Sequence, residues 1–201
     1  MSDAVPERLV GIWQRESITL EGAPSLPPGP FETARVRWFQ GHTRYADLRI
    51  PKGPPAPLCE EEAFGGRQQY VPPRLRFFHD LDRSGRLAED EGDLAWESDD
   101  VVLETGTFEF EGRSCRYTER WVRASAHDPV TLVHEARGAG AGLEGLCIRI
   151  DGARLLLRSR GGRLCAREDR IGPEGVRSVA RLDDAGPGPD VPEGGWALVE
   201  G

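Results

Sequence analysis

Aromatic and charged side chains alternate at every second position in at least four segments of the chain. Successive side chains of a β-strand point to opposite faces, so residues at i, i+2 and i+4 share one face. An inward face that carries rings and charges together suits the binding of a small, partly apolar ligand. The residues predicted to form this ligand-binding interior are Trp13, Arg15, Trp38, Gln40, Tyr45, Asp47, Arg49, His79, Glu104, Tyr117, Glu119, Trp121 and Arg123.

Charges inside a barrel need partners, because an unpaired buried charge costs several kcal/mol. The network must therefore be self-satisfied or completed by a ligand. The same side chains on an outer face would form exposed cross-strand ion pairs worth at most about 1 kcal/mol each, and the sequence leaves this alternative open. The expected pairs join Arg15, Arg49 and Arg123 to Asp47, Glu104 and Glu119.

Proton transfer is the second chemistry that these residue types allow. The carboxylates Glu104, Glu119 and Asp47, or the imidazole of His79, could act as acid or base in a dry cavity. No spacing in the chain demands this role, and no catalytic residue is assigned. The sequence has no Gly-x-Ser-x-Gly elbow, and its four histidines have no metal-ligand spacing. We expect no metal and no cofactor.

The elements that must position these side chains are short strands. Gly11-Ile12-Trp13 opens the first strand, over residues 9–21, and about ten strands follow with tight turns between them. Asp151-Gly152 and Gly161-Gly162 are strong two-residue hairpin signals. No segment shows sustained helical periodicity, and 59–64 is the one short helical turn expected, ended by a glycine pair. The pattern predicts an all-β fold, a single antiparallel up-and-down barrel, with a Greek-key sandwich as the alternative.

Domain organisation follows from the same pattern. Residues 1–8 are expected to form a tail, residues 9–182 the barrel and residues 183–201 a loose segment rich in Pro, Gly and Asp. The end of that segment, 196–199, either docks back or frays. Trp13 is expected to close the barrel floor beneath an arginine from a late strand, for which Arg123 and Arg158 are the candidates.

Bulk properties exclude several partner classes. The net charge of −8 argues against nucleic acid and against an anionic membrane surface. The N-terminus has no basic start and no apolar run, and no segment approaches a membrane span, so a cytoplasmic location is expected. The four cysteines form no C-x-x-C pair and are expected to be free thiols. A single lysine among many arginines is typical of a GC-rich bacterial genome. The oligomeric state is left open, a homodimer included.

An ordered set of motifs resembles a known family. The motifs are Gly11-Ile12-Trp13-x-Arg15-x-Ser17, Val36-x-Trp38-x-Gln40, Tyr45-x-Asp47-Leu48-Arg49-Ile50-Pro51, Ala63-Phe64-x-Gly66 and Tyr117-x-Glu119-x-Trp121-x-Arg123. Together they are similar to the uncharacterised lipocalin-like proteins of bacteria and fungi, which include the fungal Hri-type proteins. The likeness covers residues 9–125. It implies a calycin-type β-barrel, and it brings no established enzymatic activity and no ligand.

Three functions remain open at this point. The first is a non-enzymatic barrel that binds a small, partly apolar molecule between aromatic walls, with one or two arginines holding a polar or anionic group. The second is a cavity enzyme of the isomerase, cyclase or hydrolase type. The third is a filled barrel whose outer surface binds a basic protein through the acidic segments 60–62 and 89–91. A cavity or a solid interior would distinguish the third from the other two.

Overall fold

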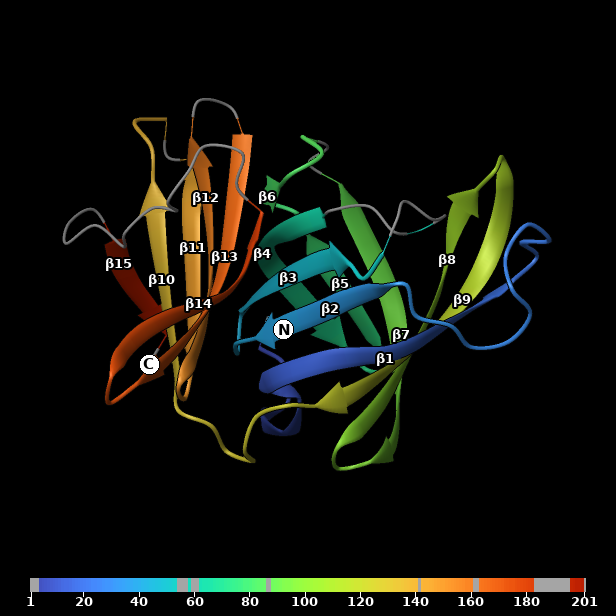
Figure 1. The fold of residues 1–201 in the computed structure, drawn as a ribbon, viewed down its shortest axis with the longest axis horizontal. Helices are drawn as coiled ribbons and strands as arrows, with labels where there is room; N and C mark the ends of the chain where they lie inside the picture. The colour runs from blue at the N-terminus through green and yellow to red at the C-terminus, as the bar shows by residue number, and fades with distance from the viewer. Residues whose placement is uncertain are drawn as a thin grey trace.

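The computed structural model describes residues 4–53, 58, 62–85, 88–140, 142–160, 163–182 and 196–200. Within these residues the chain is all-β, and the only helix is the three-residue 3₁₀ turn η1, Glu7–Leu9 (Figure 1). The strands are β1 (Gly11–Glu21), β2 (Ala34–Gln40), β3 (Arg44–Pro51), β4 (Glu62–Val71), β5 (Arg74–Phe78), β6 (Leu81–Asp82), β7 (Glu89–Ser98), β8 (Val101–Phe110), β9 (Arg113–Arg123), β10 (Thr131–Arg137), β11 (Leu143–Ile150), β12 (Ala153–Arg160), β13 (Arg163–Gly172), β14 (Gly175–Leu182) and β15 (Trp196–Glu200).

Eight antiparallel strands close into a barrel. Each of β1, β2, β3, β4, β5, β7, β8 and β9 pairs with its neighbours in this order, and β9 pairs back with β1. The short β6 is an extra strand that pairs with β4. Closure leaves no free outer edge at the β1–β9 seam, which is the physical advantage of a barrel over an open sheet. The predicted all-β antiparallel up-and-down barrel is confirmed.

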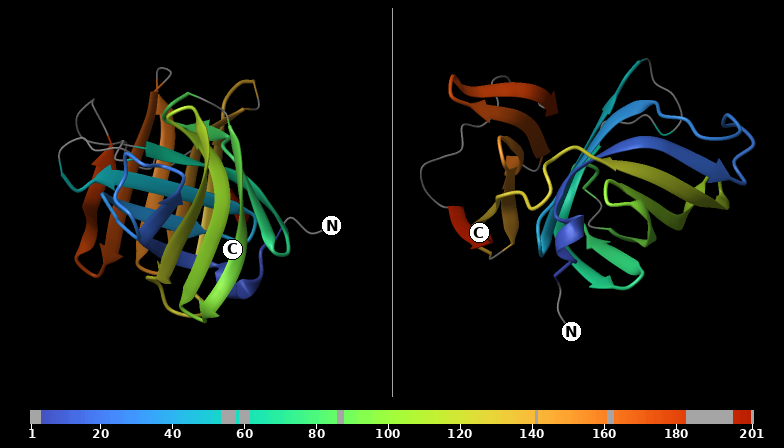
Figure 2. Two further views of the ribbon diagram at one scale, coloured as in Figure 1. Left: turned by 90° about the vertical axis from the view of Figure 1, so that its right-hand side faces the viewer. Right: turned by 90° about the horizontal axis from the view of Figure 1, so that it is seen from below.

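The barrel is shorter than the expected span of 9–182, because its last strand ends at Arg123. The later strands form a second, six-stranded sheet in the order β14-β13-β12-β11-β10-β15. This sheet lies beside the barrel (Figure 2). Eight strands therefore close the barrel, where about ten were expected. A run of hairpins with alternating side chains is the same signal in a closed barrel and in an open sheet, so the sequence pattern does not show where closure occurs.

One hydrophobic core joins the second sheet to the outer face of the barrel. It combines Ile12, Phe39 and Leu48 from the barrel with residues of β10 to β14 such as Ile148 and Leu157, all essentially buried. Each such side chain contributes about 1.5–3 kcal/mol through burial. Contacts run from β11 to β2 and β3 and from β12 to β4. The two sheets therefore share a core and are expected to unfold together.

Close approach explains a glycine pair that reads as a turn in the sequence. Gly65 lies inside β4, where an added Cβ would be 2.6 Å from the carbonyl oxygen of Tyr45 and 2.9 Å from Cδ1 of Leu157. The glycine lets β3 and the second sheet come close on either side of β4. The helical turn expected at 59–64 is wrong where the chain is described, because Glu62–Val71 is a strand. Residues 59–61 lie outside the described residues.

Ion pairs cross the same interface. Glu168 on β13 is completely buried, with Oε2 at 2.6 Å from Nη2 of Arg35 and Oε1 at 3.5 Å from Nε of Arg37. Both arginines belong to β2, so a barrel strand supplies the counter-charge for a carboxylate of the second sheet. Removing one partner of such a pair is strongly destabilising, since it leaves the other charge buried and unpaired.

The floor of the barrel is closed by the N-terminal segment. Val5 and Leu9 are buried, so the expected tail is anchored in the core at Val5, whereas Glu7 and Arg8 are exposed. Nε1 of Trp13 donates to the Leu9 carbonyl at 2.8 Å, and the guanidinium carbon of Arg123 lies 4.4 Å from the centre of the Trp13 ring. The predicted stacking of a late-strand arginine on Trp13 is confirmed, with Arg123 as the arginine.

The last strand ties the two sheets together at their ends. β15 pairs antiparallel with β10, so residues 196–200 dock on the second sheet. The Glu200 carboxylate accepts hydrogen bonds from the backbone N–H groups of His42, at 2.8 Å, and Thr43, at 2.7 Å. These two residues form the turn of the β2–β3 hairpin. Residues 183–195, which were expected to be loose, lie outside the described residues.

A bulge in β1 changes which side chains face inward. Arg15 pairs with Trp121 and Ser17 pairs with Arg120, so Glu16 is an extra residue in the ladder. After the bulge the inward face passes from odd to even positions, and Ile18 is buried. Uninterrupted alternation predicts Ser17 on the inward face with Trp13 and Arg15; this prediction is wrong, because the bulge interrupts the alternation.

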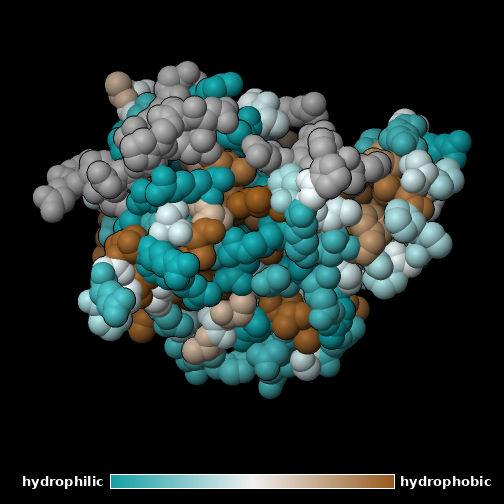
Figure 3. All heavy atoms as spheres, viewed as in Figure 1, coloured by the Kyte–Doolittle hydropathy of each residue, from teal (hydrophilic) through white to brown (hydrophobic). Residues whose placement is uncertain are grey.

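The face that carries β1, β2 and β3 is largely hydrophilic, with small hydrophobic patches between the polar side chains (Figure 3). A mixed surface of this kind is ordinary for a protein that is 30% charged. No helix among the described residues is long and apolar enough to cross a membrane.

Replacing Leu157 by Ala should destabilise the whole protein. The side chain is fully buried between the two sheets, and a Leu→Ala change in such a site costs about 2–5 kcal/mol. Denaturant unfolding followed by tryptophan fluorescence measures the barrel directly, because four of the five tryptophans belong to it. The matched control is Val176→Ala on β14, 55% exposed, which should cost less than about 1 kcal/mol. An unchanged barrel transition in Leu157→Ala would show that the sheets unfold independently.

Candidate functional site

The wall of the barrel splits between β7 and β8. Their pairing ends at Asp93 opposite Thr105, although β7 begins at Glu89 and β8 continues to Phe110. Beyond that point β7 pairs only with β5, and β8 only with β9. The two strands diverge in Figure 1. The resulting gap, which we call the β7–β8 split, is a side opening into the barrel.

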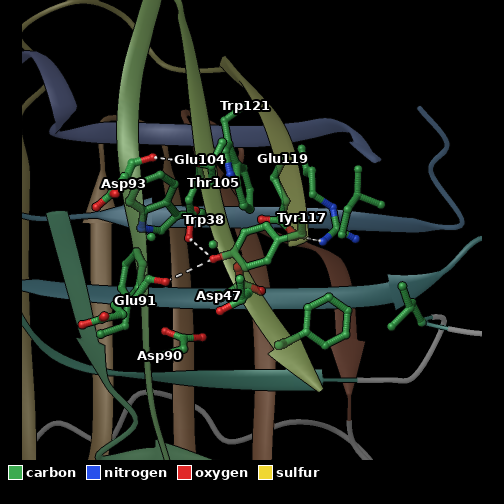
Figure 4. A pocket seen from close by; sticks show the side chains of 18 of the residues that line it. Trp38, Asp47, Asp90, Glu91, Asp93, Glu104, Thr105, Tyr117, Glu119 and Trp121 are labelled. Carbon is green, nitrogen blue, oxygen red and sulfur yellow. Dashed lines mark hydrogen bonds and ion pairs between the residues drawn. The ribbon is translucent and has the colours of Figure 1, made fainter. Parts of the chain in front are cut away.

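A cavity of about 1100 Å³ lies behind this split. Such a volume is at the upper end of the range for small-molecule sites. Both edges of the split contribute to its lining, and so does the inward face of β3 (Figure 4). The predicted interior residues that line it are Arg15, Trp38, Tyr45, Asp47, Arg49, Glu104, Tyr117, Glu119 and Trp121.

Arg15 is held between two carboxylates. Its Nη1 donates to Oε1 of Glu119 on the neighbouring strand, and its Nε lies 2.8 Å from Oε2 of Glu32. All three side chains are at most 8% exposed. The pair with Glu119 is as expected, whereas Glu32 comes from the loop before β2 and has no signal in the strand pattern. The guanidinium is thus neutralised by the protein itself.

Arg49 is also neutralised from within. Its Nε lies 3.0 Å from Oδ1 of Asp47 and its Nη1 3.4 Å from Oε2 of Glu62, and it stacks 4.9 Å over the ring of Phe64. Burial raises the pKa of Asp47 to about 6, even though Arg49 opposes this shift by favouring the carboxylate. The expected pairing of Arg49 with Asp47 is confirmed.

Glu104 is the interior carboxylate without a cation. It lies directly across the β8–β9 ladder from Glu119, and no described residue forms an ion pair with it. Its Oε1 accepts a 3.1 Å hydrogen bond from the hydroxyl of Tyr117. Burial, and then the charges of Glu119 and Asp90, raise the pKa of Glu104 to about 8. Glu104 is therefore mainly a neutral acid at pH 7.

Two glycines make room for this acid and its tyrosine. A Cβ on Gly92 would lie 2.5 Å from Cγ of Glu104, and a Cβ on Gly106 would lie 2.6 Å from Cε1 of Tyr117. Gly92 is on β7 and Gly106 on β8, one on each edge of the split. The Tyr117 hydroxyl oxygen also lies 3.4 Å from the Glu91 carbonyl oxygen and so reaches across the gap (Figure 4). Both side chains thus lie at the inner side of the opening.

Aromatic rings form the walls of the cavity. Phe77 lies edge-on to Tyr45 at 4.7 Å and to Trp38 at 5.8 Å, and Trp38 lies edge-on to Trp121 at 5.3 Å. Two polar atoms of these rings, the Tyr45 hydroxyl and Nε1 of Trp121, are buried and have no hydrogen-bond partner among the described residues. Unpaired buried polar atoms cost about 1–3 kcal/mol each, so a ligand that bonded to them would gain that free energy.

Four predicted interior residues lie outside the cavity lining. Trp13 and Arg123 belong to the floor described above. Gln40 is enclosed by its own hydrogen bonds, accepting from Nε1 of Trp38 at 2.9 Å and donating to Gln68 at 2.6 Å. Because the hydrogen-bonding groups of these side chains already have partners within the protein, the side chains stabilise the end of the barrel and are not free to bind a ligand.

His79 is the fourth of these residues. It stacks on Phe64 at 4.3 Å, with Nδ1 at 3.0 Å from Asp82 and Nε2 at 3.4 Å from Asp90. Burial disfavours the imidazolium, but the bonds to these two carboxylates outweigh it and raise the pKa of His79 to about 9. The residue is a structural cation, and its proton is held too firmly for exchange near neutral pH.

The expectation that Arg123 pairs with Glu104 or a neighbouring interior acid is wrong, since the carboxylate that Arg123 contacts is that of Asp100, at 3.4 Å.

Several lining residues were missed by the strand pattern. Ile18 faces inward only because of the β1 bulge. Asp90 and Gly92 lie on the part of β7 that precedes Leu94, where side-chain alternation does not predict a strand. The filled-barrel alternative needs the acidic segment 89–91 on the outer surface, but this segment lines the split. Of the acidic segment 60–62, Glu62 contacts Arg49, and residues 60–61 lie outside the described residues.

The lining is rich in negative charge. Its guanidinium groups are those of Arg15, Arg49, Arg74 and Arg116, and its carboxylates are those of Asp47, Glu62, Glu89, Asp90, Glu91, Asp93, Glu104, Glu109 and Glu119. Arg74 is occupied by Glu91 and Asp93 at 2.8 Å each. Because the carboxylates outnumber the cations about two to one, the site attracts positive charge.

Comparisons of the chain with protein-family models, with curated proteins and with solved structures found no match. The described residues also contain no cluster of three or more His, Cys, Asp or Glu side chains that could hold a metal ion. Cys115, Cys147 and Cys165 are free thiols, and Cys59 lies outside the described residues. The site must therefore be interpreted from its own geometry.

Replacing Glu104 by Gln should change how stability depends on pH. The folded protein holds the Glu104 proton up to a pH of about 8, whereas the unfolded chain releases it near 4.5. The unfolded state therefore binds fewer protons between these values, and the wild type loses stability as the pH rises. Glu104→Gln removes this loss and should be more stable than the wild type at pH 7, by on the order of 3 kcal/mol.

Denaturant unfolding at pH 5 and pH 8 measures this difference. The control is Glu97→Gln, an exposed carboxylate on β7 that pairs with Arg120, whose effect should stay below about 1 kcal/mol at both pH values. A gap between wild type and Glu104→Gln that does not widen with pH would show that Glu104 is ionised in the folded protein.

Proposed function

We propose that this protein is a non-enzymatic, lipocalin-like binding barrel that takes up a small, partly apolar ligand through the β7–β8 split. The observation that carries the proposal is the cavity of about 1100 Å³ with aromatic walls and unpaired polar atoms on Tyr45 and Trp121. Sites that bind small molecules are concave, mostly apolar and equipped with a few convergent polar groups. A Gly-x-Trp on the first strand, with Arg123 stacked on Trp13 at a closed floor, supports the lipocalin-like assignment.

The arginines do not support the anionic anchor that the sequence suggested. Arg15 contacts Glu119 and Glu32, and Arg49 contacts Asp47 and Glu62. A ligand anion would have to displace one of these carboxylates and leave it buried without a partner, at a cost of several kcal/mol. The filled-barrel alternative likewise has no support, because the interior next to the split is hollow.

A cavity enzyme is the second candidate, and one observation favours it. Glu104 is a buried acid that has no ion pair with any described residue and is hydrogen-bonded to Tyr117 at the inner end of the opening. A carboxyl with a pKa raised to about 8 can take up or release a proton near neutral pH. The other candidates for proton transfer are less available, since Glu119 is engaged by Arg15, Asp47 is engaged by Arg49, and His79 lies outside the cavity lining.

A thermal-shift screen against a library of small amphipathic metabolites tests the binding function. Compounds that occupy the cavity should raise the melting temperature of the wild type, because a ligand that binds only the folded state stabilises it. Gly106→Ala should weaken such compounds by about tenfold or more, since the added methyl displaces the Tyr117 ring that lines the cavity.

Gly142→Ala is the matched control. Gly142 lies just before β11 with open space around its Cα, so the variant should respond to the compounds as the wild type does. The proposal fails if no compound stabilises the wild type, or if Gly106→Ala and Gly142→Ala respond equally.

A further inference from the structure

The interior acids differ in how their charge is balanced. Glu119 contacts Arg15, and Asp47 lies 3.0 Å from Arg49. Glu104 has only the neutral hydroxyl of Tyr117, at 3.1 Å, although it is as buried as the other two. An ionised carboxylate in such a place needs a cation within hydrogen-bonding distance. The described residues supply none, so a bound cation would be the counter-ion of the ionised form.

The surroundings of Glu104 are suited to a cation with apolar substituents. Trp121, Trp38 and Tyr117 lie around it on the cavity wall (Figure 4). The faces of aromatic rings attract ammonium groups, and the attraction is strongest where water is excluded. The unpaired hydroxyl oxygen of Tyr45 is an additional acceptor for an ammonium N–H. Rings and a single unpaired carboxylate together form a site for an amine.

The negative charge at the entrance to the cavity also favours a cationic ligand. Glu89 and Asp90 line the β7 edge of the split, and Glu109 lies on the β8 edge. A cleft lined by one sign of charge concentrates ligands of the opposite sign and speeds their association. An anion would meet this rim and then find Arg15 and Arg49 already occupied. A neutral ligand would leave Glu104 in its protonated form and make no use of its charge.

We propose that the cavity binds a small organic cation, an amine with an aromatic or branched apolar group, whose ammonium group is held by Glu104 between the aromatic rings. This inference rests on the proposed binding function and names the chemical class of its ligand. The amine enters through the β7–β8 split, places its apolar group against Trp38 and Trp121, and ion-pairs with Glu104 on the inner side of the opening.

Binding of the amine should release a proton near neutral pH. Glu104 faces Glu119 and Tyr117 on β9, Asp90 on β7 and Arg49 on β3, and burial and the two acids together keep it protonated in the free protein. An ammonium group that approaches the carboxyl favours its ionised form, so the proton leaves as the ion pair forms. Affinity for the amine should therefore rise between pH 6 and pH 8.

Isothermal titration calorimetry with two matched series of probes tests the inference. The series are 2-phenylethylamine, 2-phenylethanol and phenylacetate, and tryptamine, tryptophol and indole-3-acetate. In at least one series the wild type should bind the amine about tenfold or more tightly than the alcohol, and the acid most weakly. Repeating the amine titration in buffers of different ionisation enthalpy should show net proton release at pH 7.

Glu104→Gln separates the charge from the shape of the site. The variant should lose the preference for the amine and its proton release, while it binds the alcohol within about threefold of the wild type. Glu97→Gln, an exposed carboxylate on the neighbouring strand β7, should keep the preference. Unfolding curves establish that both variants are folded before titration.

The outcomes distinguish the inference from the function on which it rests. If alcohol or acid binds as tightly as amine, or if Glu104→Gln keeps the preference, the cation assignment is overturned and the binding function stands. The same holds if none of the six probes binds while a neutral or anionic compound of the thermal-shift library does. If no compound of any class binds the wild type, the proposed function itself fails.

Discussion

Charge neutrality inside the barrel is the constraint on which the rest of the site depends. A guanidinium cannot remain in a low-dielectric interior unless a carboxylate accompanies it. Arg15 is therefore positioned between Glu119 and Glu32, and Arg49 beside Asp47. The pair of Arg15 with Glu119 joins β1 to β9, and the pair of Arg49 with Asp47 lies within β3. Both pairs place charge in the interior and neutralise it there. Glu104 is the exception, and its neutral acid form is the way in which the protein alone satisfies the same constraint.

The fold class and much of the interior could be predicted from sequence, because both follow from local geometry. The alternation of side chains along strands placed Arg15, Asp47 and Glu119 on inward faces, and the need for counter-charges then gave the two observed pairings. Gly11-x-Trp13 predicted a floor tryptophan under an arginine, which is Arg123. Each of these predictions needs only the identity of a side chain and its place within one strand.

The remaining features depend on hydrogen-bond partners that lie far away in the chain. The bulge at Glu16 changes which side chains of β1 face inward, yet nothing about a glutamate in a strand indicates that a bulge occurs there. The end of the barrel at Arg123 and the end of the β7–β8 pairing at Asp93 are decided by which strands meet in space. Glu32 reaches Arg15 from a loop, where no periodicity applies. The alternation of side chains is a local signal, so it does not predict where the barrel closes, where two strands separate or which loop residues reach the interior.

The second sheet packs against one side of the barrel. It contacts β2, β3, β4 and β6, whereas the wall that contains the β7–β8 split receives no comparable support. Thermal breathing of the wall should therefore be uneven, with backbone amides of β2 to β4 slow to exchange with solvent and those along the split fast. A barrel that is packed against a second sheet on one side can open on the other side without breaking a core contact. A ligand could therefore bind and leave while the fold stays intact.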